Sequence, residues 1–381
     1  MKRWWQRSAL AENELFVSSL SSVLAIVIGL LFGFLLMVVV SPSESIQGFR
    51  IILTGGFNDG LLSVGSMIVF ATPLIFTGLS VAFAYRTGLF NIGASGQLMM
   101  GALAATAVGV PQWWRYEGEL RIAMDNPFLQ LGSWHWVAAL LAALLAGALW
   151  GLIPGVLKAY FNVNEVVATI MLNYIAMFVN SLVITRYLFN SLIGRAFSVV
   201  PTALFPRMGM ENIFTDGLRS SQANVSFFIA IFFVIVIYFV LNYTVFGYEL
   251  KAVGFNRDAA RYAGMNAKRN LMLSMMISGG LAGMGGASLY LFAGRNLDPV
   301  LQILPQGFDG IAIALLGLGS PIGVFFAGMF FSSLKVGGQF LQLLSFRIEI
   351  IDIIISVVIY LAALSLILNR LVLYVLKREK Q

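Results

Sequence analysis

The 381-residue chain contains no cysteine and a single histidine, His135. Disulfides and thiol catalysis are therefore excluded, and zinc and haem lack their usual ligands, which leaves only a carboxylate metal site open. The sequence contains no G-x-x-x-x-G-K-[ST] phosphate loop, and no set of nucleophile, base and acid is visible. We therefore expect a protein that is not an enzyme, binds no metal or cofactor, and has no ATP site of its own.

Charge is scarce as well: 11% of the residues are charged, whereas 59% are hydrophobic. A soluble domain of this length and composition would aggregate, so the composition predicts an integral membrane protein. The net charge of +7 does not indicate nucleic-acid binding, because the basic residues lie mostly in loops and tails beside apolar segments. The first apolar run starts at about residue 17, is too long for a signal peptide and lacks a cleavage site, so it reads as an anchor.

At about 20 apolar residues per span, the sequence predicts an all-α polytopic bundle forming a single transmembrane domain over 1–381. Two stretches, 307–319 and 321–334, are too short for ordinary spans and are separated by a Gly-Ser-Pro break. We expect tilted, broken or partly re-entrant helices there, which a membrane tolerates only where protein or water satisfies the backbone. The count is nine or ten spans. The ten candidate stretches are 17–40, 61–84, 89–110, 136–157, 166–184, 225–243, 271–292, 307–319, 321–334 and 350–369.

Both termini are expected to be cytoplasmic. In this orientation 14 of the 24 basic residues lie in cytoplasmic segments, and lysine divides six inside to one outside, Lys335. Helices 2 to 5 and 7 to 10 then start on opposite sides of the membrane, which fits an inverted repeat, although no sequence repeat is visible. The outer loops 111–135 and 185–224 are expected to be interfacial caps, since the first is rich in tryptophan, or contacts for an external protein.

The segment 247–264, GYELKAVGFNRDAARYAG, is a charged, alanine-rich, helix-length insert between two apolar stretches. Five basic residues in and just after it, against two acids, place it in the cytoplasm. It resembles the permease subunits of bacterial ABC importers for nucleosides, simple sugars and related solutes. The resemblance implies that 244–270 is a coupling loop with a short helix that docks on the ATPase subunit. The residues that carry it are Gly254, Asn256, Ala259, Ala260, Tyr262, Gly264 and Met265.

The run 88–97, GLFNIGASGQ, places three glycines and the amides of Asn91 and Gln97 at the start of an apolar span. A half-helix beginning inside the protein would direct free N–H groups and a partial positive charge at a translocation path. A tight turn with close helix packing explains the glycines equally well. The run resembles the nucleoside branch of the importers, except that Ser95 stands where glutamate is common.

The stretch 155–173 also resembles nucleoside-importer permeases. At about 100° per residue, Glu165, Thr169, Asn173 and Asn180 fall within about 80° of one another and form one polar stripe. Such a stripe should not face lipid. It predicts either a pathway lining or hydrogen bonds that tie helices together, at about 0.6 to 2 kcal/mol each, with Glu165 alternatively capping its helix.

Two acids start apolar runs, Asp309 in QGFDGIAIALLGLGSP and Asp352 in IEIIDIIISVVIY. A charge at the centre of a span costs about 2.5 to 3.5 kcal/mol on insertion scales, and less near a helix N-terminus. A proton relay through Glu349, Asp352 and Ser356 is the weaker interpretation, because Arg347 is close enough to pair with the acids. The run around Asp309 resembles the permease family, where this region lines the translocation domain, so Asp309 is a pathway candidate.

Glycines at four-residue spacing predict close helix crossings, with subunit dimerisation as the alternative. They are Gly147, Gly151 and Gly155, then Gly279 with Gly283, and Ala282 with Gly286.

The resemblance covers about 60–370 and implies a vitamin-B12-permease-like bundle in the bacterial inner membrane. It further implies a transmembrane subunit that works with a second homologous permease, cytoplasmic ABC ATPase subunits and an extracytoplasmic substrate-binding protein, with membrane lipid around it and no nucleic acid. The expected substrate is a nucleoside, with a simple sugar as alternative. An ion-coupled secondary transporter would not explain the cytoplasmic helix, and a membrane scaffold would not explain the polar stripe.

Overall fold

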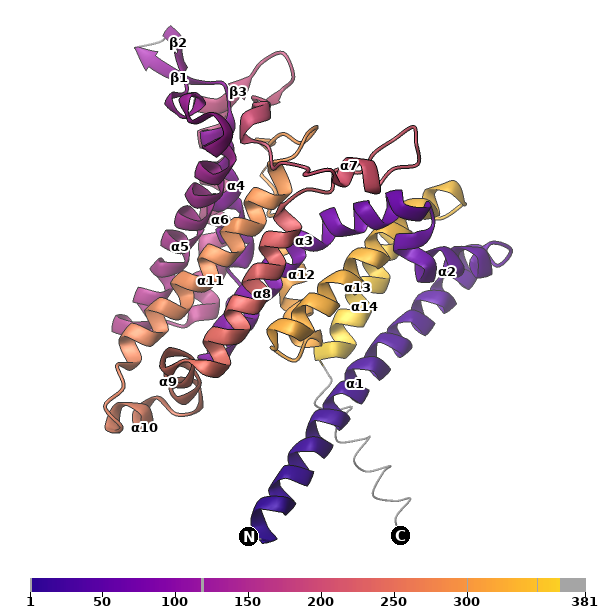
Figure 1. Cartoon of the computed structure of the whole chain (residues 1–381), viewed down its shortest axis with the longest axis vertical. Helices are drawn as coiled ribbons and strands as arrows, with labels where there is room; N and C mark the ends of the chain where they lie inside the picture. Colours follow the sequence, from indigo (N-terminus) through magenta and orange to yellow (C-terminus); the bar gives the residue numbers. More distant parts are fainter. Residues whose placement is uncertain (1, 118–119, 300, 348, 364–381) are drawn as a thin grey trace.

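The computed structural model describes residues 2–117, 120–299, 301–347 and 349–363, which form a bundle of helices (Figure 1). Seven spans within the described residues are long and apolar enough to cross a membrane. They lie in α1 (Lys2–Val40), α3 (Gly60–Arg86), α5 (His135–Phe161), α6 (Glu165–Val183), α8 (Ser226–Tyr243), α11 (Ala267–Tyr290) and α13 (Pro321–Phe340).

Three shorter apolar helices complete the bundle: α4 (Ala94–Gly109), α12 (Gln306–Leu316) and α14 (Glu349–Ala363). Each of the ten stretches predicted from the sequence overlaps one of these ten helices, so the all-α polytopic fold is confirmed. The predicted break before Pro321 is present, because α12 ends at Leu316 and α13 begins at Pro321. The last part of the predicted stretch 350–369 lies outside the described residues.

The segments between the spans hold more structure than the sequence indicated. The predicted cap 111–135 contains an antiparallel hairpin of β1 (Gln112–Glu117) and β2 (Leu120–Asp125) followed by η2 (Pro127–Trp134). A further helix, α2 (Ser45–Thr54), follows α1 and packs against α13. The other short elements are η1 (Gly55–Phe57), η3 (Ile184–Leu188), β3 (Phe189–Asn190), β4 (Arg195–Ala196), η4 (Pro201–Ala203), α7 (Met210–Ile213), α9 (Val245–Phe255), α10 (Arg257–Tyr262) and η5 (Leu341–Leu343).

The core is built around α3 and α11, the two most buried spans. α3 packs against α11, α12 and α13, and α11 packs against α5 and α4. A helix that is apolar on every side belongs inside a bundle, and α3 has that character. The helices α5 and α8 instead turn a row of large apolar side chains outward. These exposed rows are Leu141, Leu145, Leu149 and Ile153 on α5, and Phe228, Phe232, Ile235 and Phe239 on α8.

The glycine pattern is used within the chain, between α5 and α11. A Cβ at Gly283 would lie 2.2 Å from the carbonyl oxygen of Ala143, and one at Gly147 would lie 2.3 Å from that of Gly279. These distances leave no room for a side chain, so the two backbones touch. The predicted close crossing is therefore present, and small residues are what allow it.

Replacing Gly283 with alanine should destabilise the protein, because the new methyl group would overlap the backbone of α5. Overpacking of this kind costs about 1 to 3 kcal/mol, and the loss can be measured as a lower melting temperature of the purified protein in detergent. Gly280→Ala is the matched control, since a Cβ there would lie 3.4 Å from its nearest neighbour, the carbonyl oxygen of Leu144. Equal melting temperatures for the two variants would contradict the assigned helix contact.

Candidate functional site

The candidate sites lie at the two ends of the bundle and between them (Figure 1). One end carries the β1–β2 hairpin and is called the hairpin end below, and the other carries α9 and α10 and is called the α10 end. At the α10 end the predicted coupling loop, 244–270, contains two short helices, α9 and α10, where the sequence predicted one. Asn256 separates them, because its extended backbone ends α9 while its Oδ1 accepts hydrogen bonds of 3.0 Å from the N–H groups of Asp258 and Ala259 and so caps α10.

One group of predicted docking residues fastens this segment to the bundle. Gly254 lies against the turn after α3, where a Cβ would come within 2.5 Å of the carbonyl oxygen of Arg86. Ala260 is buried, with 4% exposure, and Met265 packs half-buried beside it in an apolar cluster that includes Leu271 of α11. These three residues face the bundle and hold α9 and α10 in place.

The other group points away from the bundle. Ala259 and Gly264 are exposed, and Tyr262 is 95% exposed. Gly264 has φ +84°, a backbone conformation that favours glycine and here ends the segment after α10. Phe255, which the sequence analysis did not select, is 92% exposed. Two nearly bare aromatic rings beside exposed small residues make a surface suited to a protein partner.

The turn 87–93 connects α3 to α4 inside the bundle and is held by Asn91. This side chain is fully buried, and its Nδ2 donates hydrogen bonds of 2.8 Å to Oε1 of Gln97 and to Oγ of Ser278 on α11. Its Oδ1 accepts a hydrogen bond of 3.0 Å from the N–H of Gly93. The tight turn that was one interpretation of this run is present, and α4 begins at the buried Ala94. The other interpretation, a helix start directed at a translocation path, stays a prediction. In this conformation the amides of Asn91 and Gln97 bond to the protein itself.

The polar stripe of α6 faces α4. Thr169, Asn173 and Asn180 have exposures of 0%, 1% and 3%, whereas Met171 and Tyr174 on the other side of α6 are about half exposed. Oδ1 of Asn173 accepts a 2.8 Å hydrogen bond from the N–H of Gly96, and its Nδ2 donates one of 3.0 Å to the carbonyl of Ile92. The stripe thus ties α6 to the α3–α4 turn in this conformation.

The ends of the stripe have other roles. Glu165 forms an ion pair of 2.8 Å with Lys158 of α5, next to the α10 end. The hydroxyl of Thr169 bonds to the backbone carbonyl of Glu165, one turn earlier. Asn180 donates to the carbonyl of Ala176, while its Oδ1 is buried without a partner among the described residues.

Asp309 lies in the first turn of α12 and forms an ion pair with Lys335 of α13, and these side chains are 14% and 21% exposed. The start of α12 touches the start of α4: a Cβ at Gly307 would lie 2.2 Å from the backbone nitrogen of Ser95. The N-termini of two helices therefore meet inside the bundle. Oγ of Ser95 and Oε1 of Gln306 are both buried there and have no hydrogen-bond partner among the described residues.

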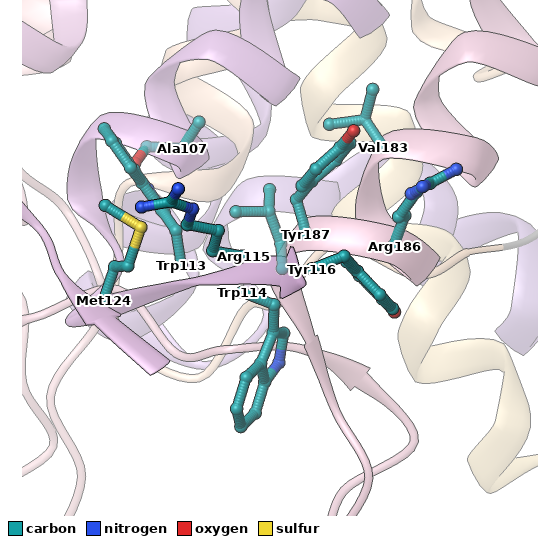
Figure 2. Close-up of a pocket in the computed structure, with 10 residues that line it drawn as sticks. Ala107, Trp113, Trp114, Arg115, Tyr116, Met124, Val183, Arg186 and Tyr187 are labelled. Atoms are coloured by element: carbon teal, nitrogen blue, oxygen red, sulfur yellow. The ribbon is translucent and has the colours of Figure 1, made fainter. Parts of the chain in front are cut away.

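A pocket of about 420 Å³ opens at the hairpin end. Figure 2 shows that aromatic and basic side chains from β1 and η3 line it. Trp114 donates a 2.7 Å hydrogen bond from its Nε1 to the carbonyl of Phe189, and the guanidinium of Arg186 lies 5.1 Å from the ring centroid of Tyr116. Trp114 thus fastens the hairpin to the segment 185–224, a role that the sequence did not indicate.

Residues 63–364 match a family described as the permease component of branched-chain amino acid transport systems. The match covers most of the chain. The chain belongs to this family of permeases. It is a multi-pass membrane protein, and the predicted family resemblance is confirmed.

Individual relatives agree with this assignment. The permease is 37% identical over 344 residues to the guanosine ABC transporter permease protein NupP of Bacillus subtilis, covering 90% of this chain and 92% of that protein. It is 33% identical to the nucleoside ABC transporter permease protein NupB of Lactococcus lactis, covering 91% and 92% of the two chains. It is 31% identical to the glucose ABC transporter permease protein TsgB13 of Haloferax volcanii, covering 72% and 68%. No solved structure matches the permease.

Sequence reasoning missed three contributors to these sites. Lys335 was used only to orient the chain, although a lone lysine inside an apolar stretch calls for a buried partner, and Asp309 is that partner. The serines Ser80 and Ser278, whose hydroxyls lie 2.9 Å apart, join α3 to α11 beside Asn91. A serine in an apolar helix gives no signal by itself, because it often bonds to its own backbone.

Replacing Asn173 with leucine should destabilise the permease, because the N–H of Gly96 and the carbonyl of Ile92 would lose their buried partner. Each orphaned group costs about 1 to 3 kcal/mol, which thermal unfolding of the purified permease would detect. Tyr174→Leu, on the exposed side of the same helix turn, should leave the unfolding temperature nearly unchanged. An Asn173→Leu variant as stable as that control would show that these hydrogen bonds do not hold α6 to the turn.

Proposed function

We propose that this permease is a transmembrane subunit of an ABC importer that carries nucleosides into the cell. The observation that carries the proposal is the α9–α10 segment, which is fastened to the bundle on one side and exposes Phe255 and Tyr262 on the other. A partner that supplies energy fits this surface, since the sequence has no phosphate loop for ATP. The named substrates of NupP and NupB support a nucleoside, and that of TsgB13 leaves a sugar as the alternative.

In this proposal the α10 end faces the cytoplasm, together with both termini, in the bacterial inner membrane. The basic residues of the segment support this orientation through the positive-inside rule. An ATPase subunit docks on Ala259, Tyr262 and Gly264. Its movement reaches the bundle through Gly254. The backbone of Gly254 lies so close to the turn after Arg86 that a displacement of one must move the other.

The hairpin end would then face the external substrate-binding protein. Its pocket offers aromatic rings and the guanidinium groups of Arg115 and Arg186, which suit acidic and apolar side chains on a partner. A second homologous permease completes the importer. Lactococcus lactis has two nucleoside ABC transporter permease proteins similar to this chain, NupB and NupC, which supports this part of the proposal.

We assign Asp309, the partly buried Glu165, and the buried polar groups Asn91, Gln97, Thr169, Asn173 and Asn180 to the substrate path in its open form. In the present conformation Asn91 bonds to Ser278 of α11 and Asn173 bonds to the N–H of Gly96 in α4, while the hydroxyl of Thr169 bonds within α6. The stripe of α6 faces α4, so α6 must move away from α4 before these groups meet a solute. Single cysteines at 173 and 180 test this assignment. If neither reacts with a hydrophilic thiol reagent at any stage of the ATP cycle, the assignment is wrong.

Tyr262→Ala should reduce recovery of the ATPase subunit with the purified permease, because it deletes the most exposed ring of the docking surface. Removing a central aromatic anchor typically costs about 2 kcal/mol or more, or roughly 30-fold in affinity. Trp134→Ala is the control, since it removes a 73% exposed ring at the hairpin end and should leave ATPase recovery unchanged. Ala260→Trp is less informative, because Ala260 is buried and a large ring would unseat α10. Full ATPase recovery with Tyr262→Ala would exclude this docking surface.

The reconstituted importer should take up a nucleoside when ATP is supplied, with or without a proton gradient. The neutral hydroxyl-bearing solute matches the amide and hydroxyl groups of the interior better than a charged amino acid would, since unpaired buried polar groups cost about 1 to 3 kcal/mol each. Radiolabelled guanosine, glucose and leucine distinguish the candidate substrates. Uptake of glucose alone would replace the nucleoside assignment, and uptake that persists without ATP would exclude an ABC importer.

A further inference from the structure

Helix α12 starts near the middle of the membrane. Its C-terminal end lies beside the last residue of α3, because Nε of Arg86 donates a 3.1 Å hydrogen bond to the carbonyl of Gly319. Gly310 packs on Thr77, nine residues before Arg86 along α3, which corresponds to about 14 Å at 1.5 Å per residue. The 11 residues of α12 rise only about 16 Å, roughly half of a 30 Å hydrocarbon core.

The chain reaches this starting point without forming a helix. The hydroxyl of Ser181, near the hairpin end of α6, donates a 3.1 Å hydrogen bond to the carbonyl of Pro299. Further along, Ile303 and Leu304 pack against Met99 of α4 and Met177 of α6. The segment 301–305 therefore descends beside α4 and α6 as irregular backbone, from the hairpin end to the start of α12.

One side of this descending segment is uncovered. Leu301 is 58% exposed and Phe308 is 41% exposed, and Gln302 and Pro305 are exposed as well. Among the described residues, no backbone N–H of 301–304 donates a hydrogen bond. Irregular backbone at membrane depth is tolerated where protein buries it or where it lines a water-filled cavity, but not against lipid. This side of the permease therefore does not face lipid.

Polar groups continue along the same side. The partly exposed ion pair of Asp309 and Lys335 lies next to it, and α14, which packs on α12, presents exposed Asp352 and Ser356 one helical turn apart. Lipid-facing surfaces of this permease look different, because the exposed rows of α5 and α8 consist of leucine, isoleucine and phenylalanine. Charged groups within spans face a bundle interior or an aqueous cavity.

We infer that these residues form the wall of the water-filled translocation path, which the second permease closes from the other side. This α12 wall consists of 301–305, the first turn of α12, Lys335 and the exposed side of α14. The inference rests on the proposed importer function. Free backbone N–H groups, the positive end of α12 and the amide of Gln302 offer hydrogen bonds to hydroxyls, and the exposed ring of Phe308 offers a stacking surface to a flat base. A neutral nucleoside matches that combination.

The lack of native cysteine makes the wall directly testable. Gln302→Cys and Phe308→Cys are introduced singly into the complete importer, and a membrane-impermeant hydrophilic thiol reagent is added from the side of the hairpin end. Both cysteines should react on the order of tenfold or more faster than cysteines in lipid, because the reactive thiolate forms in water and not in an apolar medium. Leu145→Cys and Phe232→Cys are the matched controls, since these residues are 58% and 59% exposed on α5 and α8.

Reaction at 302 and 308 no faster than at 145 and 232 would overturn the inference, whether lipid or a dry subunit contact covers the wall. Each variant is first checked for normal recovery of the ATPase subunit, and Ser356→Cys on α14 replaces any variant that fails to assemble. Excess guanosine should slow the reaction at 308 several-fold. In another outcome, cysteines at 302 and 308 react fast while guanosine neither slows the reaction nor is taken up. That result would support the water-filled wall and refute only the nucleoside assignment.

Discussion

A chain that leaves the helix inside a membrane must find other hydrogen-bond partners for its backbone, and the structure of this permease depends on how it meets that requirement at two breaks. At the turn 87–93, two asparagines supply the partners: Asn91 bonds to the N–H of Gly93, and Asn173 bonds to the N–H of Gly96 and the carbonyl of Ile92. At 301–305 the described residues supply no partner for the N–H groups. The backbone groups of the first break therefore find their partners within the chain. The N–H groups of the second break need water or another subunit as their partner.

Direct contacts join both breaks to the α9–α10 segment. Gly254 of α9 presses on the turn, Asn91 within the turn bonds to Ser278 of α11, and Ser95 at the start of α4 touches Gly307 at the start of α12. Each contact involves backbone or a fully buried side chain, so there is little free volume to absorb a displacement. A shift of α9 and α10 would therefore reach the start of α12 within a few contacts, which would give the proposed docking of an ATPase subunit a physical route to the proposed α12 wall.

The sequence predicted the spans well, because about 20 apolar residues in a row are a strong signal, and every predicted stretch holds a helix. It predicted less about the sites. Helical periodicity showed that Thr169, Asn173 and Asn180 share a face, but it could not show which neighbour that face meets, since helix packing depends on the whole bundle. The partnership of Asp309 with Lys335 joins residues of different helices, and the split of the docking residues into inward and outward groups follows from the break at Asn256. Both are properties of tertiary contact and not of spacing.

The internal hydrogen bonds of Asn91, Gln97 and Asn173 bear on how tightly this permease would hold a solute in the proposed path. Asn91, Gln97 and Asn173 already have hydrogen-bond partners within the protein, so a solute entering the path would exchange one set of bonds for another with little net gain. Among the described residues, the groups without internal partners at the start of α12 are the N–H groups of 301–304 and the buried oxygens of Ser95 and Gln306. In the proposed path, these groups are the ones at the start of α12 that a solute could bond without displacing a partner within the chain. A site with few unsatisfied groups would retain a solute only briefly, and in the proposed importer selection among solutes would then fall to the substrate-binding protein.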